Sequence, residues 1–231
     1  MRLLAVIPAR GGSKGIPRKN IYPLCGRPLV AYSIAAAQQA EAVDRIVVST
    51  DDDAIADICR GLGAEVLIRP SILAQDHTPT RDVLEHVVSS LAREAYAPDA
   101  VLTLQPTSPL RTGRHIDEAA ALFAADANAD SLVSCVAVPH IFHPLSAMRL
   151  NDEGYLEAFL PSPQPRRRQD KPPVLARNGA AIYITRTGRI SEYVFGGRLL
   201  AYLMEAESSV DVDTVEDMRL AERLLQARGL L

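Results

Sequence analysis

A basic, glycine-rich segment lies near the start of the chain, directly after an apolar run of strand length at residues 3–7. Its glycines, Gly11, Gly12 and Gly15, allow the backbone to turn tightly and to bring N–H groups close to phosphate oxygens. The polar side chains suited to a phosphate are Arg10, Ser13, Lys14 and Lys19. The spacing matches neither G-x-x-x-x-G-K-[ST] nor G-x-G-x-x-G, which argues against the usual ATPase and dinucleotide loops. Because open α/β sheets bind ligands where strands end, we expect a phosphate-binding loop here rather than a plain surface turn.

Charge is distributed unevenly between the two ends of the chain. No acidic residue precedes Glu41, whereas six basic residues do: Arg2, Arg10, Lys14, Arg18, Lys19 and Arg27. Acidic residues gather near the other end: Glu205, Glu207, Asp211, Asp213, Glu216 and Asp217. The simplest functional interpretation is an anion site at the front and a cation site at the back, and two solvated faces of opposite sign are the alternative.

Composition limits the classes of protein that this chain can represent. It has 231 residues, of which 48% are hydrophobic and 23% charged, and a formal net charge of −3. This balance is ordinary for a globular protein and argues against nucleic acid as the main partner. No apolar run reaches the length of a membrane span and the N-terminus lacks the form of a signal peptide, so we expect no membrane association and a cytoplasmic location. The three cysteines are too widely spaced for a zinc motif and are expected to be free thiols.

Apolar runs of strand length alternate with segments of helical periodicity along most of the chain. The expected strands are residues 3–7, 45–49, 65–68, 100–104 and 131–136. The expected helices lie near residues 28–39, 55–62, 83–91 and 113–125. Continuous apolar strands separated by amphipathic helices predict a mainly parallel sheet covered on both faces, which is a three-layer α/β/α sandwich.

The alternation stops at about residues 139–173, where seven prolines occur. An insertion of this length in a compact domain is usually a lid or an oligomer contact, and less often plain disorder. The sheet is expected to resume at residues 180–185 and 199–203, and Thr214 with Asp217 resembles a helix cap. The inward face of that last helix is expected to carry Val215, Met218, Ala221 and Leu225. We therefore expect a single domain over residues 1–231, with the insertion at about 139–173.

Four motifs in order give the chain a family resemblance. They are residues 9–20, the Leu-Gln-Pro-Thr-Ser-Pro-Leu-Arg run at 104–111, the Asn-Gly-Ala-Ala-Ile-Tyr run at 178–183, and Val-Asp-Val-Asp-Thr at 210–214. Together they resemble the acylneuraminate cytidylyltransferases, the CMP-sialic acid synthetase family. The resemblance implies a Rossmann-like nucleotide-diphospho-sugar transferase fold with a mixed, mainly parallel sheet. It also implies a homodimer that uses CTP, Mg²⁺ and an acidic nine-carbon 2-keto sugar to make a CMP-sugar and pyrophosphate.

The resemblance assigns roles to residues that match the family motifs. The implied catalytic residues are Arg10, Lys14, Lys19, Asp211 and Asp213. The implied substrate-binding residues are Ser13, Asn20, Arg69, Thr80, Gln105, Arg166 and Tyr183. Asp211 and Asp213 are the implied Mg²⁺ ligands, and their chemistry agrees, since Mg²⁺ is commonly held by one or two carboxylates plus substrate phosphates. An acidic helix N-terminus is the alternative, but it accounts for Glu216 and Asp217 better than for Asp211, which precedes the cap.

Two departures from the family pattern leave the sugar open. The lead-in Ala176-Arg177-Asn178 replaces the usual Arg-Pro-Asn, and residues 193–197 lack the paired phenylalanines of some sialic acid synthetases. Legionaminate and pseudaminate are therefore alternatives to N-acetylneuraminate. A nucleotidyltransferase for another sugar or nucleotide, of the Kdo or GDP-sugar type, and a non-catalytic nucleotide-binding module are the other hypotheses.

Overall fold

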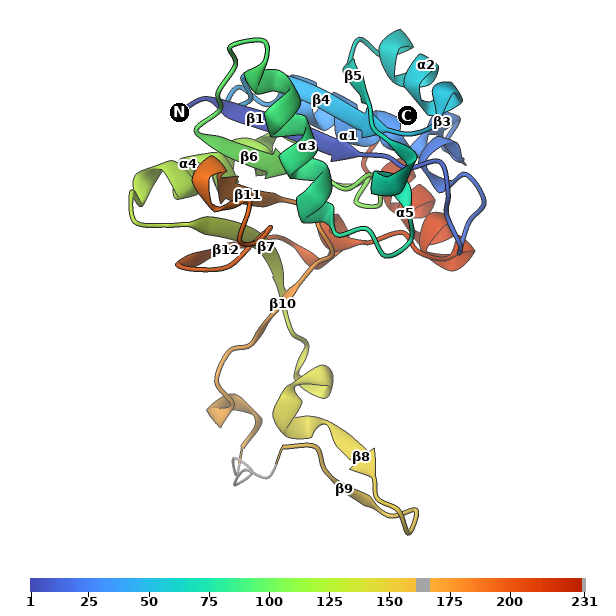
Figure 1. Ribbon diagram of the computed structural model, residues 1–231. Coiled ribbons are helices and arrows are strands. Elements are labelled where there is room, and N and C mark those ends of the chain that lie inside the picture. Colours follow the sequence, from blue (N-terminus) through green and yellow to red (C-terminus); the bar gives the residue numbers. More distant parts are fainter. Residues whose placement is uncertain (161–166, 230–231) are drawn as a thin grey trace.

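The computed structural model describes residues 1–160 and 167–229 and is built on one large mixed sheet (Figure 1). Its strands are β1 (Leu3–Pro8), β4 (Arg45–Thr50), β5 (Glu65–Ile68), β6 (Ala100–Thr103), β7 (Ser131–Ala137), β10 (Leu175–Arg177), β11 (Tyr183–Arg186) and β12 (Leu199–Leu203). They follow the order β10-β7-β11-β6-β1-β4-β5, with β12 also paired to β7. Pairs β1·β4, β1·β6, β4·β5 and β12·β7 are parallel, whereas β10 and β11 are antiparallel to their neighbours. The prediction of a mixed, mainly parallel sheet is confirmed.

Helices cover both faces of the sheet. They are α1 (Leu29–Gln39), α2 (Asp53–Gly61), α3 (Thr80–Ala92), α4 (Gly113–Ala125) and α5 (Val215–Ala227). Successive side chains of β1 point to opposite faces, as in any strand. Leu3 and Ile7 join a core that contains buried residues of α1, α2 and α4, whereas Leu4 and Val6 pack with α3. The three-layer α/β/α sandwich is therefore confirmed.

The last helix lies beside the layers and packs on the loop that follows β1. Thr214 and Asp217 form a reciprocal cap, in which the Thr214 hydroxyl accepts from the Asp217 amide at 3.2 Å and Asp217 accepts from the Thr214 amide at 2.8 Å. Met218 belongs to the buried cluster that this helix shares with the loop. The expectation that Val215 also faces inward is wrong, because it is 43% exposed and the packed stripe begins at Met218.

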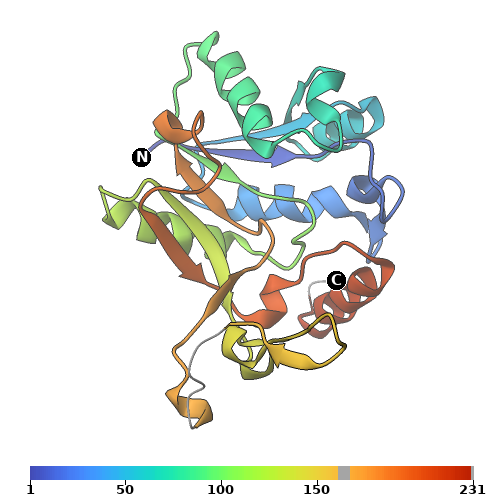
Figure 2. The same ribbon diagram turned by 60° about the horizontal axis from the view of Figure 1, so that its bottom comes forward.

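The predicted insertion forms an arm that projects from the sandwich (Figures 1 and 2). Its described part holds the antiparallel hairpin β8 (Met148–Leu150) and β9 (Leu156–Ala158), with short 3₁₀ turns at His140–Phe142, Pro144–Ser146 and Arg168–Asp170. A second small hairpin, β2 (Pro23–Leu24) with β3 (Arg27–Pro28), precedes α1. Within residues 1–160 and 167–229, no helix has the length and apolarity needed to cross a membrane.

Parallel pairing sets the position of the functional loops. Because β1, β4, β5 and β6 run in one direction, the loops that follow them emerge at the same edge of the sheet. The glycine-rich segment follows β1, Arg69 follows β5 and Gln105 follows β6. The antiparallel strand β11 starts at this edge, since Tyr183 is opposite Thr103. Residues far apart in the sequence therefore meet there.

Candidate functional site

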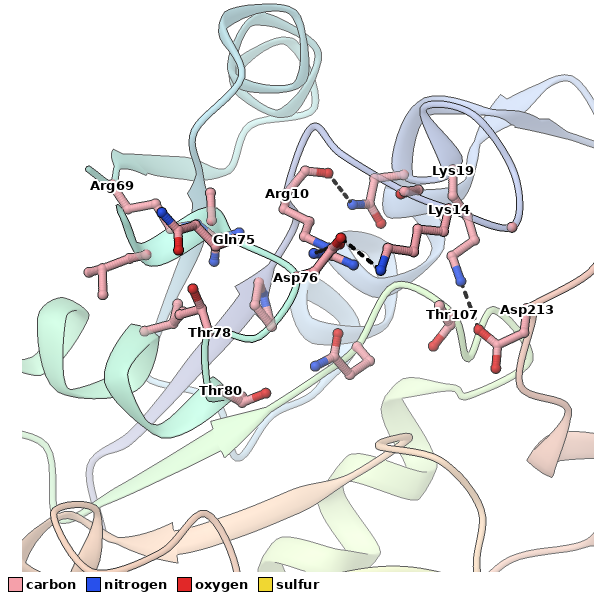
Figure 3. A pocket seen from close by; sticks show the side chains of 18 residues that line it. Arg10, Lys14, Lys19, Arg69, Gln75, Asp76, Thr78, Thr80, Thr107 and Asp213 are labelled. Carbon is pink, nitrogen blue, oxygen red and sulfur yellow. Dashed lines mark hydrogen bonds and ion pairs between the residues drawn. The ribbon is translucent and has the colours of Figure 1, made fainter. Parts of the chain in front are cut away.

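A pocket of about 490 Å³ lies at this edge, and we call it the basic pocket (Figure 3). Its lining includes nine of the residues expected from the sequence: Arg10, Ser13, Lys14, Lys19, Asn20, Arg69, Thr80, Gln105 and Asp213. The remaining lining residues are Pro8, Gly15, Leu73, Ala74, Gln75, Asp76, Thr78, Val83 and Thr107. Several cations around one hollow, beside a glycine-rich loop, suit a ligand that carries several negative charges.

The glycine-rich loop is held by its own residues and by the segment before α5. The side-chain amide of Asn20, which is buried, donates to the Arg10 carbonyl oxygen at 2.8 Å and so closes the loop on itself. A Cβ atom on Gly15 would lie 2.5 Å from the carbonyl oxygen of Asp213, which is closer than any side chain tolerates. Gly15 is therefore required by the close approach of two backbones.

Lys19 connects the loop to the acidic segment. Its ammonium group donates to the Val212 carbonyl oxygen and to a carboxylate oxygen of Asp213, both at 2.9 Å. The Lys19 side chain is only 15% exposed, whereas that of Asp213 is 73% exposed. A largely buried cation thus faces the pocket with a partner that solvent can reach.

Asp76 was missed by the sequence analysis and lies between two expected cations. One of its carboxylate oxygens accepts from Arg10 at 2.7 Å and the other is 2.9 Å from the Lys14 ammonium (Figure 3). Hydrogen bonds from Lys14 and Arg10 hold the pKa of this carboxyl below its usual value. Asp76 belongs to the polar stretch between β5 and α3, where no motif marked it. The Asp76 carboxylate therefore binds the two cations that would otherwise be available to phosphate oxygens.

Arg69 forms part of the opposite wall of the basic pocket. Arg69 is 5% exposed, and its Nε has no hydrogen-bond partner among the described residues. Its Nη2 lies 3.8 Å from a carboxylate oxygen of Asp51. Burial lowers the pKa of the guanidinium, against the influence of Asp51. A buried donor without a partner beside a pocket is available to a ligand.

The Asp211 carboxylate suits a hard cation. It packs on Gly179, where an added Cβ would be 2.6 Å from one of its oxygens, and its Oδ1 is buried without a hydrogen-bond partner in the described part of the chain. Burial raises the pKa of this carboxyl, the Thr107 side chain opposes the effect by hydrogen bonding, and repulsion from Asp213 adds to it. An unpartnered carboxylate oxygen near a second aspartate fits Mg²⁺. Within residues 1–160 and 167–229 no cluster of three or more His, Cys, Asp or Glu could hold a metal, so the other ligands would come from elsewhere.

A second pocket of about 340 Å³ adjoins the first, and we call it the aromatic pocket. It is lined by Pro79, Thr80, Arg81, Thr103, Gln105, Arg177, Gly179, Ala180, Tyr183, Val194 and Phe195. Thr80 and Gln105 line both pockets, so the two hollows share a wall. Tyr183 lies here, with its ring centroid 5.1 Å from that of Phe195 in an edge-on arrangement. The Asp211 carboxylate packs against Gly179, which lines this pocket.

The structure therefore brings eleven expected residues to two adjoining pockets. Nine line the basic pocket, Tyr183 lines the aromatic pocket, and Asp211 lines neither but packs on Gly179, which lines the aromatic pocket. Arg166 lies outside the described residues. The fold and these pockets are those of an α/β protein suited to hold a polyanionic ligand next to a second, less charged group.

Comparison with known proteins names the family. The model of the cytidylyltransferase family matches residues 4–231, and the chain belongs to that family. It is 32% identical over 230 residues to an N-acylneuraminate cytidylyltransferase of Escherichia coli O18:K1:H7, and the aligned region covers 99% of this chain and 53% of that protein. It is 34% identical over 239 residues to a CMP-N,N'-diacetyllegionaminic acid synthase of Legionella pneumophila, and the aligned region covers 98% of this chain and 97% of that protein. The chain thus spans about half the length of the first relative and nearly all of the second.

A solved structure agrees with the fold. A CMP:2-keto-3-deoxy-manno-octonic acid synthetase complexed with CTP superposes with a TM-score of 0.75 over 99% of this chain and 100% of that one, at 20% identity. At this identity the likeness concerns the fold, which is the one that the family resemblance implied.

The contact between Gly15 and Asp213 yields a test of the site's geometry. Gly15→Ala is expected to weaken the binding of a triphosphate in the basic pocket by at least about tenfold, because the new methyl group forces the loop away from Asp213. Isothermal titration of CTP measures the change. Gly12→Ala is the matched control, since a Cβ there meets no atom within 4 Å. Equal affinities for the two variants would contradict the assigned contact.

The ion pairs of Asp76 yield a second test. Asp76→Asn is expected to strengthen the binding of a triphosphate in the basic pocket roughly two- to fivefold, because Arg10 and Lys14 no longer have to leave a carboxylate to meet a phosphate. Asp57→Asn, which removes an exposed ion pair with Arg60 on α2, is expected to leave the affinity unchanged. Weaker binding by Asp76→Asn would mean that this carboxyl assists the ligand instead of competing with it.

Proposed function

We propose that this chain is a cytidylyltransferase that activates a nine-carbon acidic 2-keto sugar with CTP. The anomeric hydroxyl oxygen of the sugar forms a bond to the α-phosphorus of CTP, the bond from that phosphorus to the β-phosphate oxygen breaks, and the hydroxyl proton is released. The products are the CMP-sugar and pyrophosphate. Such transfers depend mainly on positioning and on charge stabilisation, and need little covalent chemistry from the protein.

The observation that carries the proposal is the pair of adjoining pockets. The basic pocket offers arginine and lysine side chains to a triphosphate, and the aromatic pocket shares Thr80 and Gln105 with it. A sugar in the second pocket would therefore lie next to the phosphates in the first. This arrangement suits an attack by a sugar hydroxyl on a bound nucleotide.

Each cation has a part in this scheme. Arg10, Lys14 and Lys19 would offset the charge that develops on the leaving pyrophosphate, and the buried Lys19 loses least to solvent. Asp211 and Asp213 would hold Mg²⁺, which when bound supplies a Lewis acid for the phosphate oxygens. To bind the pyrophosphate, Lys19 would have to exchange its present partner, the Asp213 carboxylate, for a phosphate.

The substrate class follows from the relatives together with the pocket. The names of the two relatives reported above concern an N-acylneuraminate and N,N'-diacetyllegionaminic acid, both acidic sugars. The aromatic pocket has two arginines in its lining and no carboxylate among the described residues that form it, which suits an acid. We further propose a cytoplasmic location, where the free thiols of Cys25, Cys59 and Cys135 would stay reduced.

The proposal is tested by pyrophosphate release from each of the four nucleoside triphosphates with a panel of acidic sugars. We expect release with CTP and one nine-carbon acid, and a loss of about 100-fold or more in Asp211→Asn, whose buried carboxylate is the proposed metal ligand. Glu207→Gln, an exposed change in the same acidic stretch, is the control. Release only with another triphosphate, or binding of CTP without turnover of any acid, would overturn the assignment. Electron paramagnetic resonance measures the binding of Mn²⁺. If Asp211→Asn binds Mn²⁺ as the wild type does, only the proposed role of Asp211 as a metal ligand is overturned.

The arm supports a further part of the proposal, which is that the enzyme is a homodimer. Its described residues expose an unusual number of large apolar side chains: Ile141, Phe142, Met148, Leu150, Tyr155, Leu156 and Phe159, each between 51% and 72% exposed. Large apolar side chains exposed together in one segment are typical of an interaction site. A second copy of the chain is a partner with the same apolar surface, as a two-fold symmetric interface requires.

Light scattering tests the dimer. The wild type is expected at twice the mass of the chain, and the double variant Phe142→Asp/Leu150→Asp at the mass of one chain, because two buried charges cost more than the apolar contact contributes. Leu220→Asp, an exposed change on α5, is expected to remain dimeric. A monomeric wild type would refute this part of the proposal without affecting the CTP assignment.

A further inference from the structure

Arg177 is a cation at the aromatic pocket that has no anionic partner in the described structure. Within residues 1–160 and 167–229, no carboxylate lies within 4 Å of its guanidinium, whereas the other arginine of the pocket, Arg81, is 3.3 Å from Asp82. Arg10 and Arg18, in the loop after β1, are by contrast paired with Asp76 and Asp52. A charge that the protein leaves uncompensated beside a pocket is available for a ligand of opposite sign.

The side chain of Arg177, an exposed residue, packs against aromatic neighbours. Its guanidinium carbon lies 4.4 Å from the centroid of the Phe195 ring, and its Nη1 donates to the Tyr183 hydroxyl at 3.4 Å. Tyr183 in turn packs edge-on against Phe195. Stacking on a ring fixes the plane of a guanidinium and leaves its edge free for two parallel hydrogen bonds, which is the geometry that a carboxylate accepts.

The backbone at this position is also fixed. Arg177 pairs with Cys135 in the antiparallel ladder between β10 and β7. The next residue, Asn178, is buried, accepts from the Ser134 hydroxyl at 2.6 Å and donates to the Ser209 hydroxyl at 2.8 Å. The guanidinium is therefore presented to the pocket from a rigid strand end, and little conformational entropy is lost when it binds a ligand.

We propose that Arg177 selects the sugar by binding its carboxylate in the aromatic pocket. The inference rests on the proposed function and adds the residue that distinguishes an acidic sugar from a neutral one. Gln105 and Thr80, which line both pockets, would then face the middle of the same sugar, between its carboxylate and the nucleotide phosphates. The test needs a readout that loss of packing alone does not change, and preference for a charged substrate over its neutral derivative is such a readout.

The experiment compares the acid that the wild type uses with its methyl ester, in the wild type, Arg177→Gln and Arg177→Lys. Arg177→Gln is expected to raise the KM for the acid about 10- to 100-fold, to leave the KM for CTP unchanged, and to abolish the preference for acid over ester. Arg177→Lys keeps the charge without the fork and is expected to retain part of the preference. Arg186→Gln is the matched control, because Arg186 also lies over a phenylalanine ring, Phe123 at 4.5 Å, but outside both pockets.

Two outcomes overturn the inference: an unchanged KM for the acid in Arg177→Gln, or a preference for the acid that survives the substitution. If the wild type turns over no acid with CTP, the proposed function fails instead. Arg177 is then tested by direct titration of N-acetylneuraminate in the presence of CDP, and equal binding by wild type and Arg177→Gln overturns the inference. Thermal melting of each variant establishes that it is folded. If Arg177→Gln is unfolded, Arg177→Lys is compared with the wild type in its place.

Discussion

The packing of the glycine-rich loop on the segment before α5 is the constraint on which the site depends. These segments are separated by 194 positions in the chain, and the Lys19–Asp213 ion pair connects them. A buried apolar cluster that includes Ile16 and Val212 brings them together, and Gly15 allows their backbones to touch. The cations that suit a triphosphate and the carboxylates that suit a metal are thereby fixed relative to each other. Neither set makes a site alone, since the cations suit the phosphates and the carboxylates suit a metal that those phosphates also bind.

A second constraint is the fully buried guanidinium of Arg111, which joins the walls of the two pockets. It donates to the carbonyl oxygens of Gln105 at 3.3 Å and Ala181 at 2.8 Å, and to the hydroxyl of Ser33 at 2.5 Å. Burial lowers its pKa to about 9, so it remains a cation at neutral pH. No carboxylate in the described part of the chain pairs with it. Its hydrogen bonds hold Gln105 in place, and its uncompensated charge contributes a positive potential beside pockets suited to anions.

The residues alone predicted the features that depend on local pattern but not the strand directions, since the mixed sheet was implied only by the family resemblance. The run at residues 3–7 and the loop after it were recognisable because period, glycine content and charge coincide there. The Thr214 cap was recognisable for the same reason. Periodicity does not give the direction of a strand, so the antiparallel β11 next to β6, and with it the meeting of Tyr183 and Thr103, had no signal. Asp76 had none either, because its position against Arg10 is set by how a long loop folds back over the sheet edge.

Three cations of the basic pocket are paired with carboxylates before any ligand binds, and this pairing determines which ligands can bind. Arg10 and Lys14 share Asp76, and Lys19 holds Asp213. Without these carboxylates, like charges crowded around one hollow would repel one another and oppose folding. Binding is therefore an exchange of partners, in which a ligand must offer more than each carboxylate already does. A monoanion replaces one ion pair by another and gains little, since exposed pairs contribute at most about 1 kcal/mol. A triphosphate can meet all three cations at once, releases both carboxylates, and frees Asp213 to join Asp211. The paired cations thus favour a polyphosphate over a single anion, and they do so before any contact with the base or the sugar is made.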